Sequence, residues 1–294
     1  MVNLPIVHII GNMLNMGEFR REKLNRLQHL VPAGMLATTA WLRKRGYPTN
    51  LLVHYVSRGW LESPARGVYR RPGAPLKWQH AVYSLTQMLE GSVHVGGLTA
   101  LELRGYAHFL KPSGLARVDL YLDAKPPGWL AKLDLGVRFV THRNALFAFA
   151  AKAMHEPERP AYALRQEVNA VATEPWGAWD DPLPVALPER AMLEFLDEVP
   201  ANQSLEHAAL LMQGLHDLAS KRVLELLRAC RSVKVKRLFL ALAARQQFQW
   251  VRPVLAAADR GEVDLGRGKR SLGKGGRFDA KYQITVPDDS DVRG

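Results

Sequence analysis

The sequence predicts an α+β protein, with an N-terminal winged helix-turn-helix followed by a mixed α/β middle and a mainly helical C-terminal part. Residues 38–73 contain, in order, a short helical stretch, a Gly-Tyr-Pro turn, a second helical stretch and a basic hairpin. The middle alternates helical stretches with short β-branched runs, and from Pro188 onward apolar residues recur at helical spacing. A chain of 294 residues is long enough for two or three domains with buried cores.

The helix-turn-helix is predicted from the residues at its turn. Gly46 ends the first helix behind a basic last turn, which suits the negative end of the helix dipole. Pro48 keeps the preceding residue out of helical geometry, and Thr49 is expected to cap the next helix, Thr49–Arg58. The wing is expected to consist of two short strands, Trp60–Leu61 and Gly67–Tyr69, joined by a turn at 63–66.

The second helix has a polar face opposite its apolar face, and at about 15 Å it suits the DNA major groove. The residues at core-facing positions are Leu51, Leu52, Tyr55 and Val56. The candidates for contacts with base edges are Thr49, Asn50, His54 and Ser57. The cations expected to hold DNA phosphates are Lys44, Arg45, Arg58, Arg66, Arg70 and Arg71.

A helix-turn-helix also occurs as a packing element that contacts protein and no DNA. Charge favours DNA here, because residues 1–75 contain 11 Lys and Arg against 3 Asp and Glu, a net charge of +8. The net charge of the whole chain is +12, and the remainder is unevenly distributed. It is −5 over residues 76–220, +11 over 221–281 and −2 in the tail. An acidic middle therefore separates two cationic ends.

Several classes of chemistry are excluded or unsupported. The single cysteine, Cys230, rules out an intramolecular disulfide and a Cys-based zinc site, and its apolar context predicts a buried thiol. The ten histidines show no metal-binding spacing, and Asp119 and Asp123 lack a third carboxylate nearby in sequence. We therefore expect no enzymatic activity, no metal and no cofactor.

No apolar run approaches the length of a membrane span. Residues 1–17 are apolar but lack the features of a signal peptide, so we expect a packing arm or a start-site extension. The expected location is cytoplasmic, without membrane contact.

A Gly-rich basic loop, Gly266–Gly276, lies near the C-terminus. Its segment Gly268–Lys274 has the spacing of a phosphate-binding loop, but Gly275 occupies the position of the Mg²⁺-binding hydroxyl and no long helix follows. The loop is expected to be a tight cationic turn, with contact to nucleic acid or an acidic partner as the alternative. The basic stretch 221–245 is either a solvated helix face or a second surface for a polyanion. The candidates for such a C-terminal surface are Lys234, Lys236, Arg237, Lys269, Arg270 and Lys274.

The domain boundaries follow from these patterns. The expected parts are an extension at 1–17, a winged helix-turn-helix DNA-binding domain at 18–75, a C-terminal domain at 76–286 with a sub-boundary near 180–187, and a disordered tail at 287–294. The expected helices are Glu18–Leu30, Trp78–Leu89, Leu98–Leu103, one from Pro188, Ser204–Ala219, Val223–Cys230 and Val235–Ala244. The expected strands are Val93–Val95, Arg117–Leu122, Val137–Thr141 and Lys281–Val286.

From about Glu18 to Val286 the chain resembles the AbiEi-like antitoxins of type IV toxin–antitoxin (abortive infection) systems. Residues 94–108, HVGGLTALELRGYAH, resemble the central signature of that family. Three further segments resemble its C-terminal motifs, namely Pro188–Ala191, Val233–Phe239 and Leu265–Arg270.

The resemblance implies an antitoxin active in phage defence, whose winged helix binds inverted repeats in the promoter and represses its own operon. It also implies a C-terminal domain that counteracts a nucleotidyltransferase-like toxin without a stable complex. Inverted repeats require two modules per site, from a dimer or from monomers that bind DNA cooperatively. Two alternatives stay open: a protein–protein module that binds the toxin directly, and an RNA-binding protein that shields the toxin's substrate.

Overall fold

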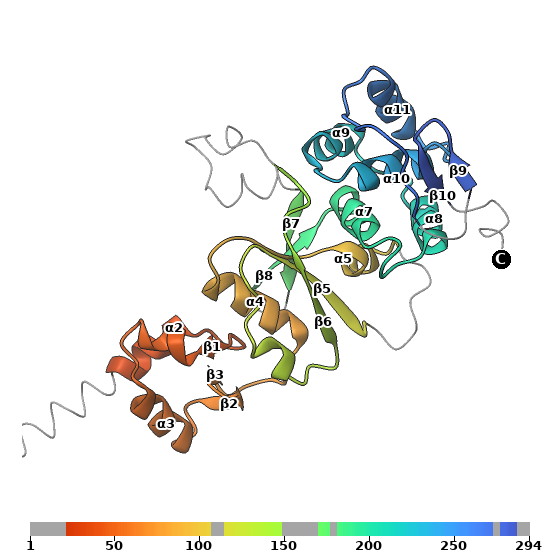
Figure 1. Cartoon of the computed structure of the whole chain (residues 1–294). Helices are drawn as coiled ribbons and strands as arrows, with labels where there is room; N and C mark the ends of the chain where they lie inside the picture. The colour runs from red at the N-terminus through yellow and green to blue at the C-terminus, as the bar shows by residue number, and fades with distance from the viewer. Residues whose placement is uncertain (1–21, 107–114, 149–169, 177–180, 273–276, 287–294) are drawn as a thin grey trace, which may run out of the picture. The chain divides into compact units, whose positions relative to one another are not determined.

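The structure, a computed structural model, describes residues 22–106, 115–148, 170–176, 181–272 and 277–286 (Figure 1). The extension 1–17, the tail 287–294 and Lys274 lie outside these residues. The chain divides into two compact units. Unit 1 comprises the chain up to Met88 together with 128–135, and unit 2 comprises 89–127 and the chain from 136 onward.

Unit 1 contains a winged helix, as predicted. Residues 22–30 are helical and precede a three-stranded antiparallel sheet of order β1-β3-β2. The labelled elements are β1 (Ala37–Thr38), α2 (Thr39–Arg43), α3 (Thr49–Ser57), β2 (Glu62–Ala65), β3 (Val68–Arg70), α4 (Trp78–Met88) and the 3₁₀ helix η1 (Leu130–Lys132).

Two details at the turn and the wing differ from expectation. Pro48 rather than Thr49 is the N-cap of α3, because the fixed φ of proline already gives the extended geometry of a cap. The first wing strand begins at Glu62 instead of Trp60, and the turn is Arg66–Gly67, with Gly67 at φ +74°. A glycine at this position permits the left-handed turn.

Unit 1 extends past residue 75, where we expected the DNA-binding domain to end. Tyr83 and Met88 of α4 pack against the core of the winged helix, which includes Leu42 and Leu52. In addition, the backbone N–H of Leu36 donates to Ser84 Oγ at 2.7 Å. Helix α4 therefore completes the apolar core of this unit.

Unit 2 is built on a five-stranded mixed sheet of order β6-β5-β4-β8-β7. Strands β5 and β6 pair in parallel, as do β4 and β8, and the other two pairings are antiparallel. The strands are β4 (Val93–Val95), β5 (Arg117–Leu122), β6 (Arg138–Arg143), β7 (Val171–Trp176) and β8 (Asp181–Ala186). The first three confirm the predicted strands, whereas β7 and β8 were not predicted.

The helices of unit 2 largely follow the predicted pattern. Pro188 is the first residue of α7, and Ser204 caps α8 by accepting from the N–H of His207, both as expected. Helix α8 ends at Gly214 rather than at residue 219. The helices are α5 (Gly97–Leu103), α7 (Pro188–Asp197), α8 (Leu205–Gly214), α9 (Ser220–Ala229), α10 (Val233–Ala243) and α11 (Val251–Asp259), the last not predicted.

The last residues that the structure describes form a two-stranded antiparallel hairpin of β9 (Arg277–Asp279) and β10 (Ile284–Val286). Residues 281–283, which we expected to be strand, form the turn between them. Cys230 is buried as predicted, and burial raises the pKa of its thiol to about 11. None of the described helices is long and apolar enough to cross a membrane.

Candidate functional site

The exposed face of α3 is the first candidate site. Thr49, Asn50 and Ser57 are exposed there, while Leu52 and Tyr55 are buried on the opposite side. Val53, which the sequence reasoning did not select, is 58% exposed on the same face. Its spacing of three and four residues from Asn50 and Ser57 is the signal that identifies it.

His54, the remaining base-contact candidate, is only half-buried and packs against its neighbours. Its ring meets the edge of Trp60, with centroids 6.1 Å apart, and Trp60 itself is 42% exposed. His54 therefore borders the exposed face of α3 rather than standing at its centre.

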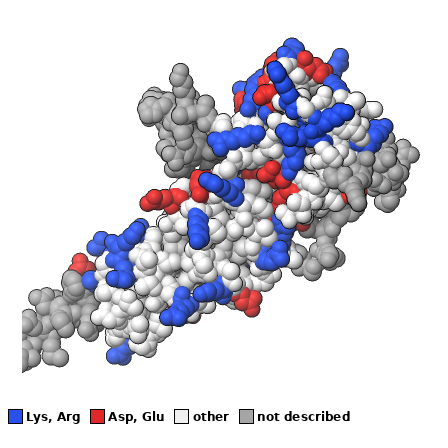
Figure 2. Space-filling view, in the orientation of Figure 1, with Lys and Arg blue, Asp and Glu red and all other residues white. Residues whose placement is uncertain are grey.

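Four of the six predicted phosphate ligands are exposed cations near this face. They are Lys44, Arg45, Arg58 and Arg66. The Arg45 guanidinium also lies over the Trp41 ring, 3.6 Å from its centroid, which orients the charge. In Figure 2, Lys and Arg make up most of the charged side chains over the region that α2 and α3 occupy in Figure 1.

The other two predicted phosphate ligands, Arg70 and Arg71, form hydrogen bonds within unit 1. Arg70 donates from Nε to Glu62 Oε2 at 2.7 Å and from Nη1 to the carbonyl of Ala74 at 2.8 Å, and its side chain is 11% exposed. Arg71 donates to the carbonyl of Gln28. Arg70 therefore ties the wing hairpin together, because β2 and β3 place it opposite Glu62.

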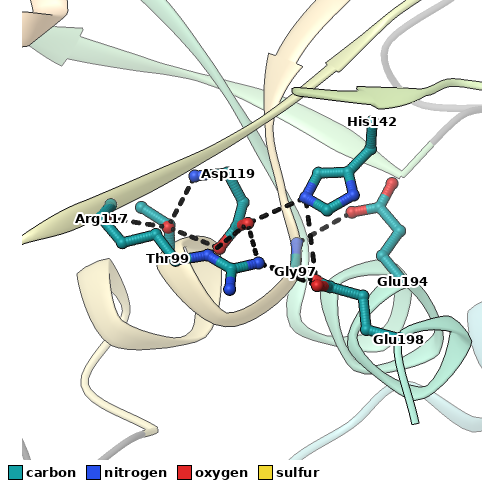
Figure 3. Close-up of polar contacts among 7 residues, drawn as sticks. All are labelled: Gly97, Thr99, Arg117, Asp119, His142, Glu194 and Glu198. Carbon is teal, nitrogen blue, oxygen red and sulfur yellow. Dashed lines mark hydrogen bonds and ion pairs between the residues drawn. The ribbon is translucent and has the colours of Figure 1, made fainter. Parts of the chain in front are cut away.

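A second candidate lies inside unit 2, where the segment 94–108 meets α7. His94 on β4 contacts Glu194 Oε1 on α7 at 2.8 Å, and both side chains are 1% exposed. Glu194 Oε2 accepts from the backbone N–H of Gly97 at 3.1 Å, at the start of α5 (Figure 3). Arg190, one turn earlier on α7, donates to Glu194 Oε1 at 2.6 Å.

A second group of ionisable side chains continues this network (Figure 3). Asp119 is fully buried on β5. Its Oδ1 accepts hydrogen bonds from His142 Nε2 at 2.9 Å and from the Arg117 guanidinium at 2.5 Å. Arg117 also donates to Glu198 Oε2 at 2.8 Å, and Thr99 Oγ1 accepts from the backbone N–H of Asp119 at 2.9 Å. Tyr121 stacks on both His94 and His142.

Asp119, His142 and Glu198 offer ligand atoms within 4.8 Å of one another, which is the spacing of a metal site. However, the Arg117 guanidinium bonds to both carboxylates and supplies the positive charge that they require. The geometry is therefore that of an ion-pair network in which Arg117 bridges both carboxylates. The sequence reasoning noted Asp119 but missed the other members, which lie on separate elements.

The ionisation of the network follows from its contacts. Burial by itself raises the pKa of Glu194, but His94 and Arg190 outweigh burial and lower this pKa to about 2. Burial and the nearby Arg190 lower the pKa of His94. Glu194 is therefore ionised and His94 neutral at pH 7, and the stability contributed by the Glu194 carboxylate is lost as pH falls below its ordinary pKa of 4.5.

Gly96 has no space for a side chain. A Cβ at this position would lie 2.2 Å from Glu194 Oε2 and 2.6 Å from the Tyr121 ring. We expect Gly96→Ala to lower the free energy of unfolding by about 1–3 kcal/mol, because a methyl group overpacks this site. Urea unfolding checks this, with Gly128→Ala as the control, since nothing lies within 4 Å of a Cβ there. Equal stability of the two variants would contradict the close packing at Gly96.

Glu102 on α5 makes the stability of unit 2 depend on pH in the opposite direction from Glu194. Burial and then the charge of Asp119 raise the pKa of Glu102 to about 7, from an ordinary value of 4.5. The ionised form is therefore disfavoured in the folded state, and stability is lost as pH rises from 4.5 through 7. We expect Glu102→Gln to stabilise the protein at pH 8 and to have no effect below pH 4.5 in thermal unfolding across this pH range. Stabilisation of equal size at both pH values would contradict this origin.

The C-terminal cations that the structure describes do not form one exposed surface. Lys236 and Arg237 are 5% and 3% exposed, so neither side chain lies on the open surface. Their positions on α10 face the core, because the whole segment 235–243 of this helix is buried. Lys234 is partly exposed and donates to the carbonyls of Asp197 and Val199. Lys269 and Arg270 are exposed, as expected.

Comparison with known families identifies the chain. A family model described as the N-terminal domain of AbiEi antitoxin transcriptional regulators matches residues 20–112. A second model, described as a transcriptional regulator, the AbiEi antitoxin of type IV toxin–antitoxin systems, matches residues 116–287. The chain belongs to the AbiEi antitoxin family. Both models describe transcriptional regulators that are AbiEi antitoxins.

A solved structure supports the fold of this AbiEi family member. The crystal structure of the RV2827C protein from Mycobacterium tuberculosis matches with a TM-score of 0.52 and 17% identity over 88% of each chain. At this identity the similarity concerns the fold alone. No curated protein matches the chain.

The four segments that resemble AbiEi motifs meet in pairs in unit 2. The segment 94–108 contacts the Pro188–Ala191 segment through Glu194, which binds both His94 and Arg190. The Val233–Phe239 segment contacts Leu265–Arg270 through Arg237, which donates to the carbonyls of Leu265, Gly266 and Gly268. These motifs therefore hold distant parts of unit 2 together.

Proposed function

We propose that this antitoxin represses its own operon by binding inverted repeats in promoter DNA through the winged helix of unit 1. We further propose that unit 2 counteracts a nucleotidyltransferase-like toxin in the cytoplasm. The observation that carries the DNA proposal is the exposed face of α3 with exposed cations beside it.

The geometry of α3 suits the major groove. The helix has 9 residues and is therefore about 14 Å long, so its exposed face can reach base edges in one segment of the groove. Asn50 offers an amide that can pair with adenine, and Val53 offers a methyl surface for the methyl group of thymine. Arg58 follows the end of α3 and Arg66 lies at the tip of the wing, where each can reach a phosphate.

Recognition of an inverted repeat requires two copies of the winged helix. Each copy reads one half-site, and two half-sites about 34–36 Å apart lie on the same side of the duplex. We propose that the two copies come from a dimer or from monomers that bind cooperatively, so binding curves on a full repeat should be steeper than on a half-site.

A promoter–reporter assay tests the repressor role. The DNA upstream of the gene is fused to a reporter, and the full chain is expressed from an unrelated promoter. Wild type should repress, and Arg58→Gln combined with Arg66→Gln should not. Arg138→Gln, which removes an exposed cation of unit 2, is the matched control. Repression by the double variant at the wild-type level would overturn this role for unit 1.

A growth-rescue assay tests the antitoxin role separately. The chain is expressed together with the product of the adjacent open reading frame, which the proposal expects to be a nucleotidyltransferase-like toxin. The double variant at Arg58 and Arg66 should still restore growth, because neutralisation is assigned to unit 2. Failure of wild type to restore growth would contradict the antitoxin proposal. Co-purification of the tagged toxin in a stable complex would instead support direct binding.

A further inference from the structure

We propose that unit 2 contains a binding pocket for a phosphate group, formed by the Gly-rich segment 265–268 and the turn 281–283. We call it the C-terminal anion pocket. It is independent of the proposed DNA interface, because all of its residues belong to unit 2. The ligand class is a phosphate ester or pyrophosphate, as carried by a nucleotide or by the end of a nucleic acid.

The C-terminal anion pocket has a volume of about 290 Å³, which is at the lower end of the range for small-ligand sites. The residues that line it are Arg237, Leu265, Gly266, Arg267, Gly268, Lys281, Tyr282 and Gln283. Three of these eight are cations and none is an acid. The lining therefore favours an anion of the size of a phosphate or pyrophosphate.

Arg237 supplies a buried positive charge that no carboxylate balances among the described residues. Its guanidinium donates to four backbone carbonyls, three in 265–268 and the fourth at Gln283. A buried charge that meets only neutral acceptors is costly unless a counter-charge is nearby. An anion in the adjacent pocket would provide that counter-charge without displacing the carbonyls.

The glycines let the loop wrap closely around Arg237. Gly266 has φ +61°, and a Cβ there would lie 2.9 Å from Val233 on α10. Gly268 has φ +80°. Only glycine adopts this backbone readily at so close an approach. The loop therefore presents Arg267 from a fixed backbone rather than as part of a loose basic tail.

Arg267 and Lys281 place cations at the mouth of the pocket. Both are exposed, and Arg267 has no ion-pair partner in the described part of the chain. Lys281 pairs with Asp259 at 2.9 Å, and two further carboxylates accept from backbone N–H groups of the lining, Asp264 from Gly266 and Asp279 from Tyr282. An incoming phosphate can therefore bind Arg267 directly and share Lys281 with Asp259.

Tyr282 adds an unsatisfied polar group. The residue is 3% exposed, and its hydroxyl lies beside the Lys281 ammonium, which can only donate to it, so the hydroxyl proton has no acceptor among the described residues. Buried hydroxyls in folded proteins are generally bonded, so an orphan of this kind requires an explanation. A phosphate oxygen in the pocket that Tyr282 lines would supply the missing acceptor.

The pocket differs from the phosphate-binding loop that its sequence superficially resembles. The residues that follow Gly268 do not begin a helix among the described residues, so no helix dipole points at the ligand. The recognition that we propose instead uses side-chain cations and a tyrosine hydroxyl.

Isothermal titration calorimetry of the full chain with sodium pyrophosphate tests the proposal. Wild type should bind one equivalent saturably, at an ionic strength held constant with sodium chloride. Arg267→Ala should weaken binding by about tenfold or more, since a hydrogen bond to a charged group is worth about 1.5–3 kcal/mol. The control is Arg252→Ala, which removes an exposed cation from α11 outside the pocket. Absence of saturable binding by wild type, or equal weakening in both variants, would overturn the pocket.

Tyr282→Phe provides a second, less disruptive variant. It removes only a hydroxyl whose proton has no acceptor among the described residues, so the thermal unfolding temperature should change little while pyrophosphate binding weakens. Unchanged binding would show that the hydroxyl does not contact the ligand.

Titrations with ATP and with 5′-phosphorylated RNA then distinguish a free nucleotide from a nucleic-acid end. The Arg58 and Arg66 variant should bind pyrophosphate normally, which separates this proposal from the DNA proposal.

Discussion

Replacing Arg190 with alanine is expected to lower the free energy of unfolding by about 3–5 kcal/mol, because it leaves a buried carboxylate without its cation. Arg190 is 2% exposed, donates to Glu194 and, at 2.6 Å, to Asn144, and lies over the Phe147 ring. Glu194 would keep His94 and the backbone N–H of Gly97 as hydrogen-bond partners but would lose the neighbouring guanidinium. Chemical denaturation of the full chain measures the loss.

The matched control for Arg190→Ala is an exposed ion pair in the same unit. Arg228, whose side chain is 47% exposed, pairs with Glu262. Its replacement by alanine should lower stability by less than about 1 kcal/mol, because solvent screens such pairs. A loss of similar size for both variants would show that the network at Glu194 is not a main support of unit 2.

Replacing Asn50 with alanine is expected to weaken binding to the cognate promoter site by about 1–3 kcal/mol, or about 5–150-fold in affinity. Asn50 is exposed in the first turn of α3, where the helix would enter the groove. Binding to unrelated DNA should not change, because Asn50 carries no charge and non-specific binding is electrostatic. Fluorescence anisotropy on cognate and scrambled duplexes at one salt concentration measures both.

Asn202→Ala is the control for Asn50→Ala, because it removes an exposed amide from unit 2. A uniform loss of affinity on both duplexes in the Asn50 variant would indicate a phosphate contact or a damaged helix. Val53→Ala extends the test, since loss of an apolar contact should matter most where the site contains thymine.

Local sequence signals predicted much of this fold. The turn at Gly46 and Pro48 fixed the order of the helix-turn-helix, and Pro188 marked the first residue of α7. These features depend on neighbouring residues, so a single sequence contains them. The shift of the wing strand to Glu62 is a small error of the same local kind, since edge strands tolerate proline at position 64.

The parts that sequence reasoning missed depend on distant contacts. Strand β8 contains Pro182 and Pro184, which argue against a strand, yet it lies between β4 and β7 in the sheet. It pairs with β4 only at Val185, so the prolines do not interrupt a long ladder on that side. Helix α11 contains Pro253 at its third position, where the missing N–H is tolerated.

The site residues also divide into those that local sequence predicts and those that depend on distant contacts. The exposed positions of Thr49, Asn50 and Ser57 on α3 follow from helical periodicity, whereas Val53 was missed and His54 only borders the exposed face. In contrast, His94 and Glu194 are 100 residues apart in the sequence, and no local pattern connects them. The burial of Arg237 was also missed, because its partners are backbone carbonyls, which leave no trace in side-chain composition.

The most direct test of the central claim is a salt titration of full-length protein binding to the DNA upstream of its own gene. Wild type should bind this DNA specifically, with log K falling linearly against log salt concentration. Arg58→Gln with Arg66→Gln should reduce the magnitude of that slope by about 2, roughly one per lost phosphate contact. Arg138→Gln should leave the slope unchanged. Lack of preference for the upstream DNA, or an unchanged slope in the double variant, would contradict the assignment of the winged helix as the DNA-reading element.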